Sequence, residues 1–461
     1  MSILRSHRGL IILMTGLLVG SLLGLGCKGG DPKAKEAAQP LTLNWWRIEG
    51  EKSNFDQIIK DYKTSQPNIS VNIQTVRAEE LENKLLEALA AGTGPDIVSL
   101  PNSSLGGWLD KLSPLPASLK LPSVEIKGLF KKEAQWYFKT SSTIKPQALT
   151  DTFVDVVARD AIFDNKTYGL PISLDTLLLF YNRDLLNNAQ ISTAPATWTE
   201  FKDATQKITV LDKSGFFVQH GAAVGEADNV PYSDDILSAL MLQNGTPMTN
   251  NTGTAATFNQ AVKVGGQDFF PGADALRFYT DFANPSKETY TWSRDQSNAW
   301  QLFAAGKIGF VFAYWRDLAT LRTLSPKINI GVANFPQIDA ADKPVYYASY
   351  YLETVPKQSQ HPNEAWNFIQ YVTTKSEVAD KYLTSAQKPT ALRSLINKQL
   401  EDIDLGKPAK QLLTAKSWYH GSKSKIMREI FQNMIRQAAG GVDLKQAIDF
   451  AVNQVGQTLR K

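Results

Sequence analysis

The stretch YGLPISLDTLLLFYNRDLL, residues 168–186, decides how this chain is organised. Its apolar run is typical of a buried strand, yet it carries one carboxylate, Asp175, near its start. Burying a carboxylate without a partner costs several kcal/mol. Asp175 therefore either caps a turn or faces a ligand. At the other end of the run, Asn182 and Asp184 have the chemistry of a helix start.

Upstream of this stretch, residues 41–100 alternate between strand and helix patterns. This order predicts a parallel, helix-covered sheet, because parallel neighbours need a long crossover connection. Ligands of such sheets bind beyond the carboxyl ends of the strands, where Trp45, Trp46 and Asn102 stand. The pattern predicts strands at 41–46, 69–76 and 95–100, a helix that carries Phe55 and Tyr62, and a helix from residue 78 that ends before Gly92.

The later chain continues as alternating helices and strands. Thr197 or Thr199 begins a helix with Glu200 as capping-box partner, and Asn244 and Gly245 end another. Residues 113–150 are less regular and are interpreted as a surface elaboration, with a helical pattern at 129–139. Further strands are expected at 308–314 and 329–338, and helices at 363–374 and 445–455.

Length and charge narrow the class of protein. A chain of 461 residues favours two lobes over a single core. The net charge of +4 falls by two once Arg5 and Arg8 are removed with the leader described next. So small an excess does not suit a protein that binds the phosphate backbone of a nucleic acid, and no nucleic-acid partner is expected.

The N-terminus has the pattern of an export signal. Arg5, His7 and Arg8 precede an apolar run at 10–26, which has the length and flanks of a signal peptide. Cys27, the only cysteine, follows at once and cannot form an internal disulfide. Residues 1–26 with Cys27 resemble a bacterial lipoprotein leader whose cysteine is acylated, although Gly24 stands where that leader usually has leucine. Ordinary cleavage or an uncleaved anchor are the alternatives, and residues 27–40 are expected to be the lipidated cysteine and a flexible tether.

Four motifs in one order resemble the extracellular solute-binding proteins of ABC importers, the group that contains the maltodextrin- and other sugar-binding proteins. The resemblance runs from about Leu41 to the C-terminus. Its most specific part is the opening stretch followed by APATWTEF. The other motifs are EALAAGTGPDIVSL, LFAAGKIGFVFAYW, and NFPQI followed by HPNEAWNFIQYV.

The resemblance implies an α/β, two-lobe fold of the type II periplasmic-binding-protein kind, with a hinge between two helix-covered sheets. The first lobe is expected to be 41–174 with 337–386, and the second 176–335 with 390–461. The chain would cross between them near 174–176, 335–336 and 385–389. Such a protein closes over its ligand because the ligand binds the closed form better.

Aromatic residues near predicted strand ends are candidate ligand contacts. Indole faces suit the C–H surfaces of sugar rings, which points to Trp45, Trp46, Trp315 and Trp418. Packing in the core or hinge is the equal alternative for each. Trp45 and Trp46 are neighbours in a strand, so only one of them can face a cleft.

The resemblance adds polar partners. It places a carboxylate at the first crossing, which is Asp175, an aromatic ligand contact at Tyr232 and an amide after the third strand at Asn102. A turn cap is the alternative for Asp175 and a helix cap for Asn102. Arg316 either binds an acidic sugar or pairs with Asp317 at the surface or behind the site.

Two rival functions come from other features. Iron-binding relatives use a tyrosine pair as metal ligands, and this chain has Tyr346–Tyr347 and Tyr350–Tyr351. The simpler interpretation turns one of them, Tyr347, toward a sugar. A carbohydrate-active enzyme is the weaker rival, since no HExxH, GxSxG or phosphate-binding GxxxxGK[ST] motif is present.

The sequence therefore predicts a monomeric, membrane-anchored lipoprotein in the periplasm or at the cell surface. It would capture a sugar or small oligosaccharide and deliver it to an ABC permease. No catalytic residue, metal or cofactor is expected.

Overall fold

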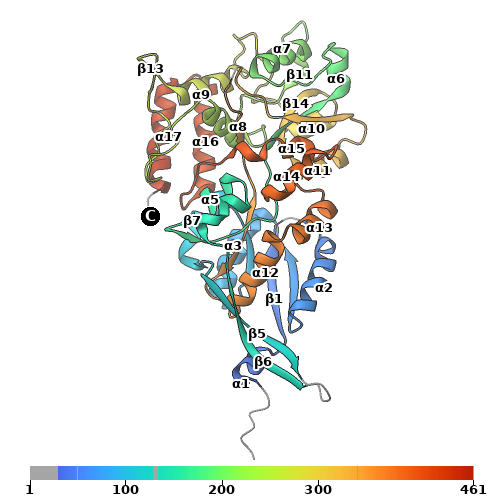
Figure 1. Ribbon diagram of the computed structural model, residues 1–461. Coiled ribbons are helices and arrows are strands. Elements are labelled where there is room, and N and C mark those ends of the chain that lie inside the picture. Colours follow the sequence, from blue (N-terminus) through green and yellow to red (C-terminus); the bar gives the residue numbers. More distant parts are fainter. Residues whose placement is uncertain (1–29, 49, 128–132, 340, 460–461) are drawn as a thin grey trace, which may run out of the picture. The chain divides into compact units, whose positions relative to one another are not determined.

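The computed structural model describes residues 30–48, 50–127, 133–339 and 341–459 (Figure 1). These residues form two compact units. The smaller comprises the described parts of Met1–Leu41 and Lys120–Ser141, and the larger comprises Thr42–Leu119 with Ser142–Lys461. The larger unit contains two five-stranded sheets, which define its first and second lobes.

The first lobe is built on the sheet ordered β2-β1-β3-β17-β4. Strands β1 and β3 run parallel, with Trp45 opposite Ile97, as their alternation with helices predicted. Strand β17 returns antiparallel to β3. The strands are β1 (Leu41–Arg47), β2 (Ile69–Thr75), β3 (Ile97–Pro101), β4 (Leu112–Ser113) and β17 (Tyr351–Pro356). The helices include α2 (Asp56–Ser65), α3 (Ala78–Ala90), α12 (Pro362–Thr374) and α13 (Ser376–Ala386).

The second lobe is built on the sheet ordered β10-β11-β14-β9-β15. Strand β9 (Leu177–Asn182) is the apolar run of the opening stretch, and it lies between two antiparallel neighbours. Its first four side chains have no exposed surface, so the continuous apolar run follows from burial on both faces. The other strands are β10 (Val210–Leu211), β11 (Phe217–Ala222), β14 (Ile308–Tyr314) and β15 (Ile330–Asn334).

Local capping sets the helices around this sheet. Thr197, not Thr199, caps α7 (Trp198–Ile208) in a capping box with Glu200. Asn182 accepts the backbone N–H of Asp184 at the start of α6 (Arg183–Asn188). The remaining longer helices are α8 (Ser233–Gln243), α9 (Pro271–Asp281), α11 (Leu318–Leu324), α16 (Ser424–Ala439) and α17 (Leu444–Leu459).

The second crossing between the lobes lies further along than expected. Phe335 stays in the second-lobe core, with its ring 5.2 Å from that of Trp198 and 5.0 Å from that of Phe312. Strand β16 (Tyr346–Tyr347) also belongs to that core and pairs with β18 (Ala415–Lys416). The chain therefore crosses at residues 348–350, because the apolar side chains before them are already buried in the second lobe.

The third crossing is shifted in the same direction. Leu392 forms a bridge with Phe153, and the Arg393 guanidinium donates to the Thr150 and Phe153 carbonyls. Helix α14 (Arg393–Leu400) therefore stays with the first lobe. Gln411 then donates to the Leu177 carbonyl in the second lobe. The crossing thus falls between residues 400 and 411 rather than at 385–389.

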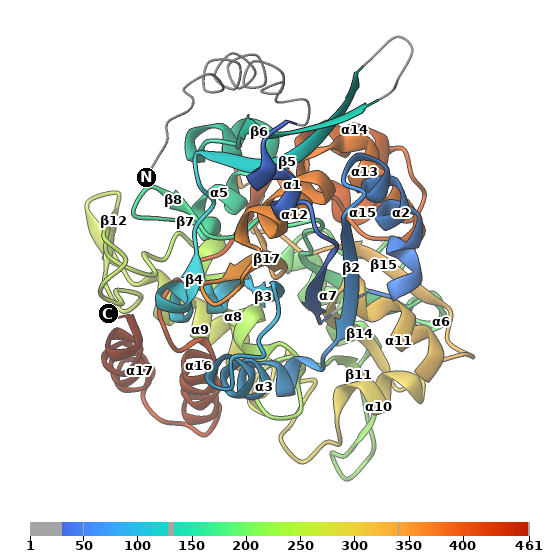
Figure 2. The same cartoon turned by 90° about the horizontal axis from the view of Figure 1, so that it is seen from below.

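The smaller unit differs most from expectation. The helix predicted at 129–139 is wrong, since β6 (Glu133–Ser142) is a strand paired with β5 (Ser118–Lys127). Residues of the expected flexible tether form the short helix α1 (Pro32–Ala37), with Ala34 fully buried. Helix α1 lies beside β5 and β6 (Figure 2). The leader and Cys27 lie outside the described residues.

A buried ion pair organises the first-lobe core. Glu353 on β17 accepts hydrogen bonds from Arg47 Nη1 at 3.0 Å, Trp45 Nε1 at 2.7 Å and Ser99 Oγ at 2.6 Å. The side chains of Arg47 and Glu353 are 6% and 2% exposed. Three strands of the sheet therefore share one desolvated carboxylate, which pins their register.

We expect Arg47→Met to lower the free energy of unfolding by about 3–5 kcal/mol, because it leaves the buried Glu353 carboxylate without its guanidinium. Guanidinium chloride titration measures this change. The double variant Arg47→Met/Glu353→Gln should recover part of the loss. Lys381→Met, which removes the exposed Lys381–Asp61 pair, should change stability by less than about 1 kcal/mol. An Arg47→Met effect as small as this control would contradict the argument.

Candidate functional site

The crossing segments meet around a small cavity of about 10 Å³. A cavity of this volume holds about one water molecule. Its walls come from the first crossing, the second crossing, the end of β14 and the segment after α13. The lining residues are Ser173, Leu174, Asp175, Arg316, Ser349, Tyr350, Tyr351, Lys388 and Pro389.

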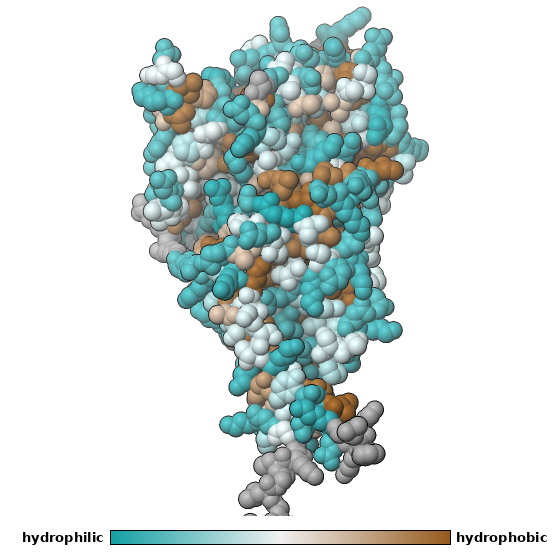
Figure 3. Space-filling view, viewed as in Figure 1, coloured by the Kyte–Doolittle hydropathy of each residue, from teal (hydrophilic) through white to brown (hydrophobic). Residues whose placement is uncertain are grey.

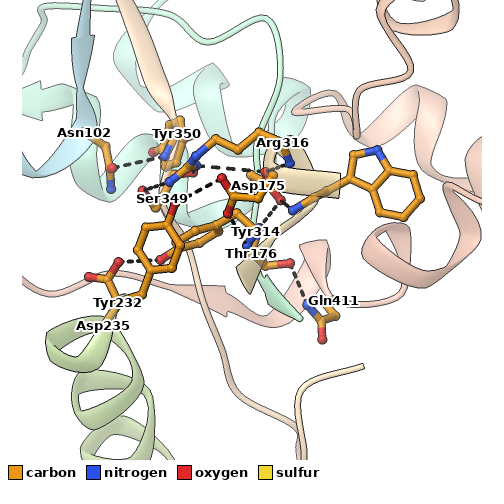
Figure 4. Close-up of polar contacts among 12 residues, drawn as sticks. Asn102, Asp175, Thr176, Tyr232, Asp235, Tyr314, Arg316, Ser349, Tyr350 and Gln411 are labelled. Atoms are coloured by element: carbon orange, nitrogen blue, oxygen red, sulfur yellow. Dashed lines mark hydrogen bonds and ion pairs between the residues drawn. The ribbon is translucent and has the colours of Figure 1, made fainter. Parts of the chain in front are cut away.

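Asp175 ties the first crossing to the end of β14 (Figure 4). Its Oδ1 accepts the backbone N–H of Thr176 at 2.9 Å and of Trp315 at 3.1 Å, and its Oδ2 accepts that of Arg316 at 2.9 Å. Trp315 and Arg316 begin the turn η5 (Trp315–Asp317). The carboxylate thus caps a turn that is distant in sequence, which accounts for its burial at 7% exposure.

Arg316 connects the same turn to the second crossing. Its Nη1 donates to the Ser349 carbonyl at 2.8 Å and its Nη2 to Ser349 Oγ at 3.1 Å. The guanidinium lies 4.0 Å from the centre of the Tyr314 ring, a favourable cation–π position. Only 16% of the side chain is exposed, so Arg316 is part of the hinge rather than of a solvated surface pair.

Two tyrosines lie next to Arg316. Tyr232 donates to Asp317 Oδ1 at 3.1 Å, and Tyr314 donates to Asp235 Oδ2 at 2.7 Å. Their rings meet edge to face at 4.8 Å. Tyr232 has a φ of 59°, a strained backbone conformation for an aromatic residue. Burial, with a further contribution from Asp317, raises the pKa of the Tyr232 hydroxyl.

Asn102 links β3 to the second crossing. Its backbone N–H donates to the Tyr350 carbonyl at 2.9 Å, and its Nδ2 donates to Asp160 Oδ2 at 2.8 Å. Asp160, on α5 (Asp155–Ala161), also accepts the Tyr350 hydroxyl at 2.8 Å and lies 2.9 Å from His420 Nε2. Asn102 therefore connects elements instead of capping the turn that follows it.

The four candidate tryptophans have different environments. Trp45 lies in the first-lobe core with no exposed surface, whereas its neighbour Trp46 is half-buried. Trp315 Nε1 donates to the Gln387 carbonyl at 2.8 Å, so it reaches across to the first lobe. Trp418 packs on Phe431 and donates to Ser238 Oγ at 3.1 Å. Trp45 thus follows the packing alternative in this structure.

Of the nine predicted ligand contacts, five are brought together at the hinge. Tyr347 is instead buried in the second-lobe core, where burial raises the pKa of its hydroxyl. Sequence reasoning missed Asp160, Asp235 and Ser349, because no motif marks residues whose partners come from distant segments, and it considered Tyr350 only as a possible metal ligand. The gathered residues are Asn102, Asp175, Tyr232, Trp315 and Arg316.

Asp234 is a second buried carboxyl group, next in sequence to Asp235, which accepts the Tyr314 hydroxyl. Asp234 is 2% exposed, and neither of its oxygens accepts a hydrogen bond of ordinary geometry within the described residues. Arg428 Nε lies 2.9 Å from its Oδ2. Burial and then the charge of Asp235 raise the pKa of Asp234 from 3.8 to about 7, against the opposing effect of Arg428.

The cavity at the crossing segments is much smaller than the ligand pockets of proteins, which usually measure about 300–1,000 Å³. A larger hollow of about 540 Å³ lies on the second lobe beside β15, but none of the nine predicted residues lines it. Across the part of the chain that the structure describes, no three His, Cys, Asp or Glu side chains are placed to hold a metal ion.

Comparison with known proteins identifies the family and the fold. The profile of the family described as "Bacterial extracellular solute-binding protein" matches residues 47–379. The galactooligosaccharide-binding protein of Bacillus subtilis is 21% identical, covering 94% of this chain and 92% of that protein. The maltodextrin-binding protein of the same organism is 23% identical, covering 86% and 85%. The fold resembles the cyclic alpha-maltosyl-1,6-maltose binding protein of Arthrobacter globiformis, with a TM-score of 0.71, 18% identity and coverage of 91% and 99%.

We expect Asp175→Asn to lower the free energy of unfolding by about 1.5–3 kcal/mol, because an amide nitrogen replaces one acceptor of a charged hydrogen bond. Chemical denaturation measures the loss. The matched control is Asp184→Asn in the exposed first turn of α6, which should cost no more than about 1 kcal/mol. Equal effects of the two variants would show that Asp175 does not hold the hinge.

We expect Asp234 to make the protein less stable as pH rises from about 4 toward 7. In that range the folded chain keeps a proton on Asp234 that the unfolded chain has lost, so stability falls with pH and the loss is complete above the folded pKa of about 7. Unfolding measured across this range should show the slope in the wild type and a smaller one in Asp234→Asn. Asp228→Asn, at an exposed ion pair, should keep the wild-type slope, and an unchanged slope in Asp234→Asn would contradict the assignment.

Proposed function

The chain belongs to the bacterial extracellular solute-binding protein family, and we propose that it captures a sugar or small oligosaccharide for an ABC importer. One observation supports this most directly. The first crossing, the second crossing and the turn after β14 are joined by Asp175, Arg316 and Ser349. A rotation of one lobe against the other therefore acts on a single connected cluster.

The polar and aromatic groups at the hinge fit a carbohydrate. Tyr232, Arg316 and Asp235 combine ring faces, donors and acceptors within one region. Sugar hydroxyls need paired donors and acceptors, because an unmade hydrogen bond in a closed site is costly. Two relatives are named for galactooligosaccharide and maltodextrin, and this chain is proposed to take a ligand of that class.

The two rival functions have less support. The Tyr350 hydroxyl is engaged with Asp160, and Tyr347 is buried in the second-lobe core, so neither tyrosine pair is set out as an open metal site. The relatives compared above are binding proteins. We propose that the chain does not chemically change the sugar it binds.

The proposed site of action is outside the cytoplasm, in keeping with the family description. Among the described residues, no helix combines the length and the apolar content that a membrane span requires. We propose that acylated Cys27 anchors the chain and that the loaded protein delivers its ligand to a membrane permease. It would act as a monomer.

A ligand screen tests the carbohydrate proposal. We expect a member of a panel of mono- and oligosaccharides to raise the melting temperature, since ligand at 100 times its Kd adds about 2.7 kcal/mol. Peptides and ferric ion form the control arms. Chromatography of the recovered sugar should show it unchanged. A response to ferric ion alone would contradict the sugar proposal. Recovery of cleaved sugar would contradict the proposal that the chain does not chemically change its ligand.

A further inference from the structure

The smaller unit joins the N-terminal segment to the β5–β6 hairpin. Gly30 forms a bridge with Trp136 of β6, and the backbone N–H of Asp31 donates to the Trp136 carbonyl at 2.7 Å. Gly30 has a φ of 73°, and a Cβ there would lie 2.2 Å from the Trp136 carbonyl oxygen, so this approach requires glycine. Helix α1 starts directly afterwards. The segment is thus attached to the hairpin rather than free of it.

Covalent geometry limits how far this hairpin can be from the predicted anchor. Consecutive Cα atoms are 3.8 Å apart, so the Cα of Cys27 lies within about 11 Å of the Cα of Gly30. If Cys27 carries the anchor, as proposed above, Trp136 and its neighbours are held at the membrane surface. An uncleaved leader would impose the same limit, because its apolar run ends at residue 26.

The hairpin exposes apolar side chains in this position. Ile126 is 66% exposed, Tyr137 42% and Val124 38%. Figure 3 shows apolar residues of the hairpin at the surface, in brown beside teal hydrophilic ones. Lys120 lies with its Nζ 4.4 Å from the centre of the Phe138 ring. Aromatic and aliphatic side chains next to lysines are the composition of a surface that lies in the headgroup region of a bilayer.

The positive charge of the chain is concentrated in the same unit. Its described residues have one more basic than acidic side chain, and by sequence alone the segments 28–41 and 120–141 together have four more. Arg5 and Arg8 add two more, so the larger unit has a negative excess. The described charged residues of the smaller unit are Lys33, Lys35, Lys120, Lys127 and Lys139 against Asp31, Glu36, Glu125 and Glu133, and Lys28, Lys131 and Lys132 lie outside the described residues.

We propose that the β5–β6 hairpin and helix α1 form a membrane-seating element that lies on anionic lipid headgroups. Its apolar side chains enter the interface, and its lysines are attracted to the negative surface of the bilayer. The occupant is a lipid surface rather than a second copy of this chain, because the anchor, the exposed apolar residues and the excess charge all belong to one unit. The inference depends on the proposed anchor at Cys27.

A fluorescent label tests the seating. Once Cys27 is acylated, Ile126→Cys supplies the chain's only free thiol, so an environment-sensitive fluorophore can be attached there in the full-length lipoprotein. The labelled protein is placed in vesicles of phosphatidylcholine with phosphatidylglycerol. We expect iodide quenching to fall several-fold relative to detergent, and lipid-borne nitroxide to quench the label. The matched label at Ile403→Cys, 94% exposed in the larger unit, should stay open to iodide.

Reversing the charge of hairpin lysines tests whether the hairpin binds anionic lipid or is merely held near the bilayer by the anchor. Lys120→Glu/Lys127→Glu/Lys139→Glu should restore much of the iodide quenching at Ile126, whereas Lys213→Glu, an exposed lysine of the larger unit, should not. Sedimentation with the vesicles is measured in parallel. A protein that sediments while its Ile126 label stays fully open to iodide overturns the hairpin proposal alone. A protein that does not sediment overturns both the anchor and the seating, and sugar binding is unaffected by either result.

Discussion

The hinge depends on the Asp175 carboxylate, which accepts backbone N–H groups from the first crossing and from the turn after β14. Thr176 belongs to the first crossing, and Trp315 and Arg316 follow the central strand β14. A charged acceptor shared between distant segments holds them more firmly than neutral contacts do. Arg316 extends the connection to Ser349 at the second crossing, so one cluster couples the points at which the lobes are joined.

Other buried charges have a related role in the lobes themselves. Glu353 joins three strands of the first sheet through Trp45, Arg47 and Ser99. Asp160 joins β3, the second crossing and the segment that precedes α16 through Asn102, Tyr350 and His420. Replacing one partner of such a group is costly because the other stays desolvated. The fold thus uses carboxylates to connect segments that hydrophobic packing alone would not hold in one register.

The sequence predicted most of the regular elements around these groups. The parallel pair β1 and β3, the capping box at Thr197 and the buried apolar run of β9 all agree with their local patterns. The failure at residues 133–142 has a physical reason. Trp136, Tyr137 and Phe138 are consecutive, and a short apolar run of this kind fits either a strand or one face of a helix. The later crossings were implied by the resemblance alone, and they lie further along because Phe335 packs on Trp198 in the second lobe and Leu392 pairs with Phe153 in the first.

The sequence by itself determined the family through its four motifs, and the resemblance to that family implied the two-lobe organisation and a carboxylate at the first crossing. Only the tertiary structure decided what each candidate side chain contacts. Trp45 and Trp46 look equivalent in sequence, yet one is buried against Glu353 and the other is half-buried. The direction of a side chain depends on which distant segments pack around it. For Asp175, likewise, the sequence predicted the carboxylate but not its partners. Trp315 and Arg316 lie 140 and 141 residues further along the chain.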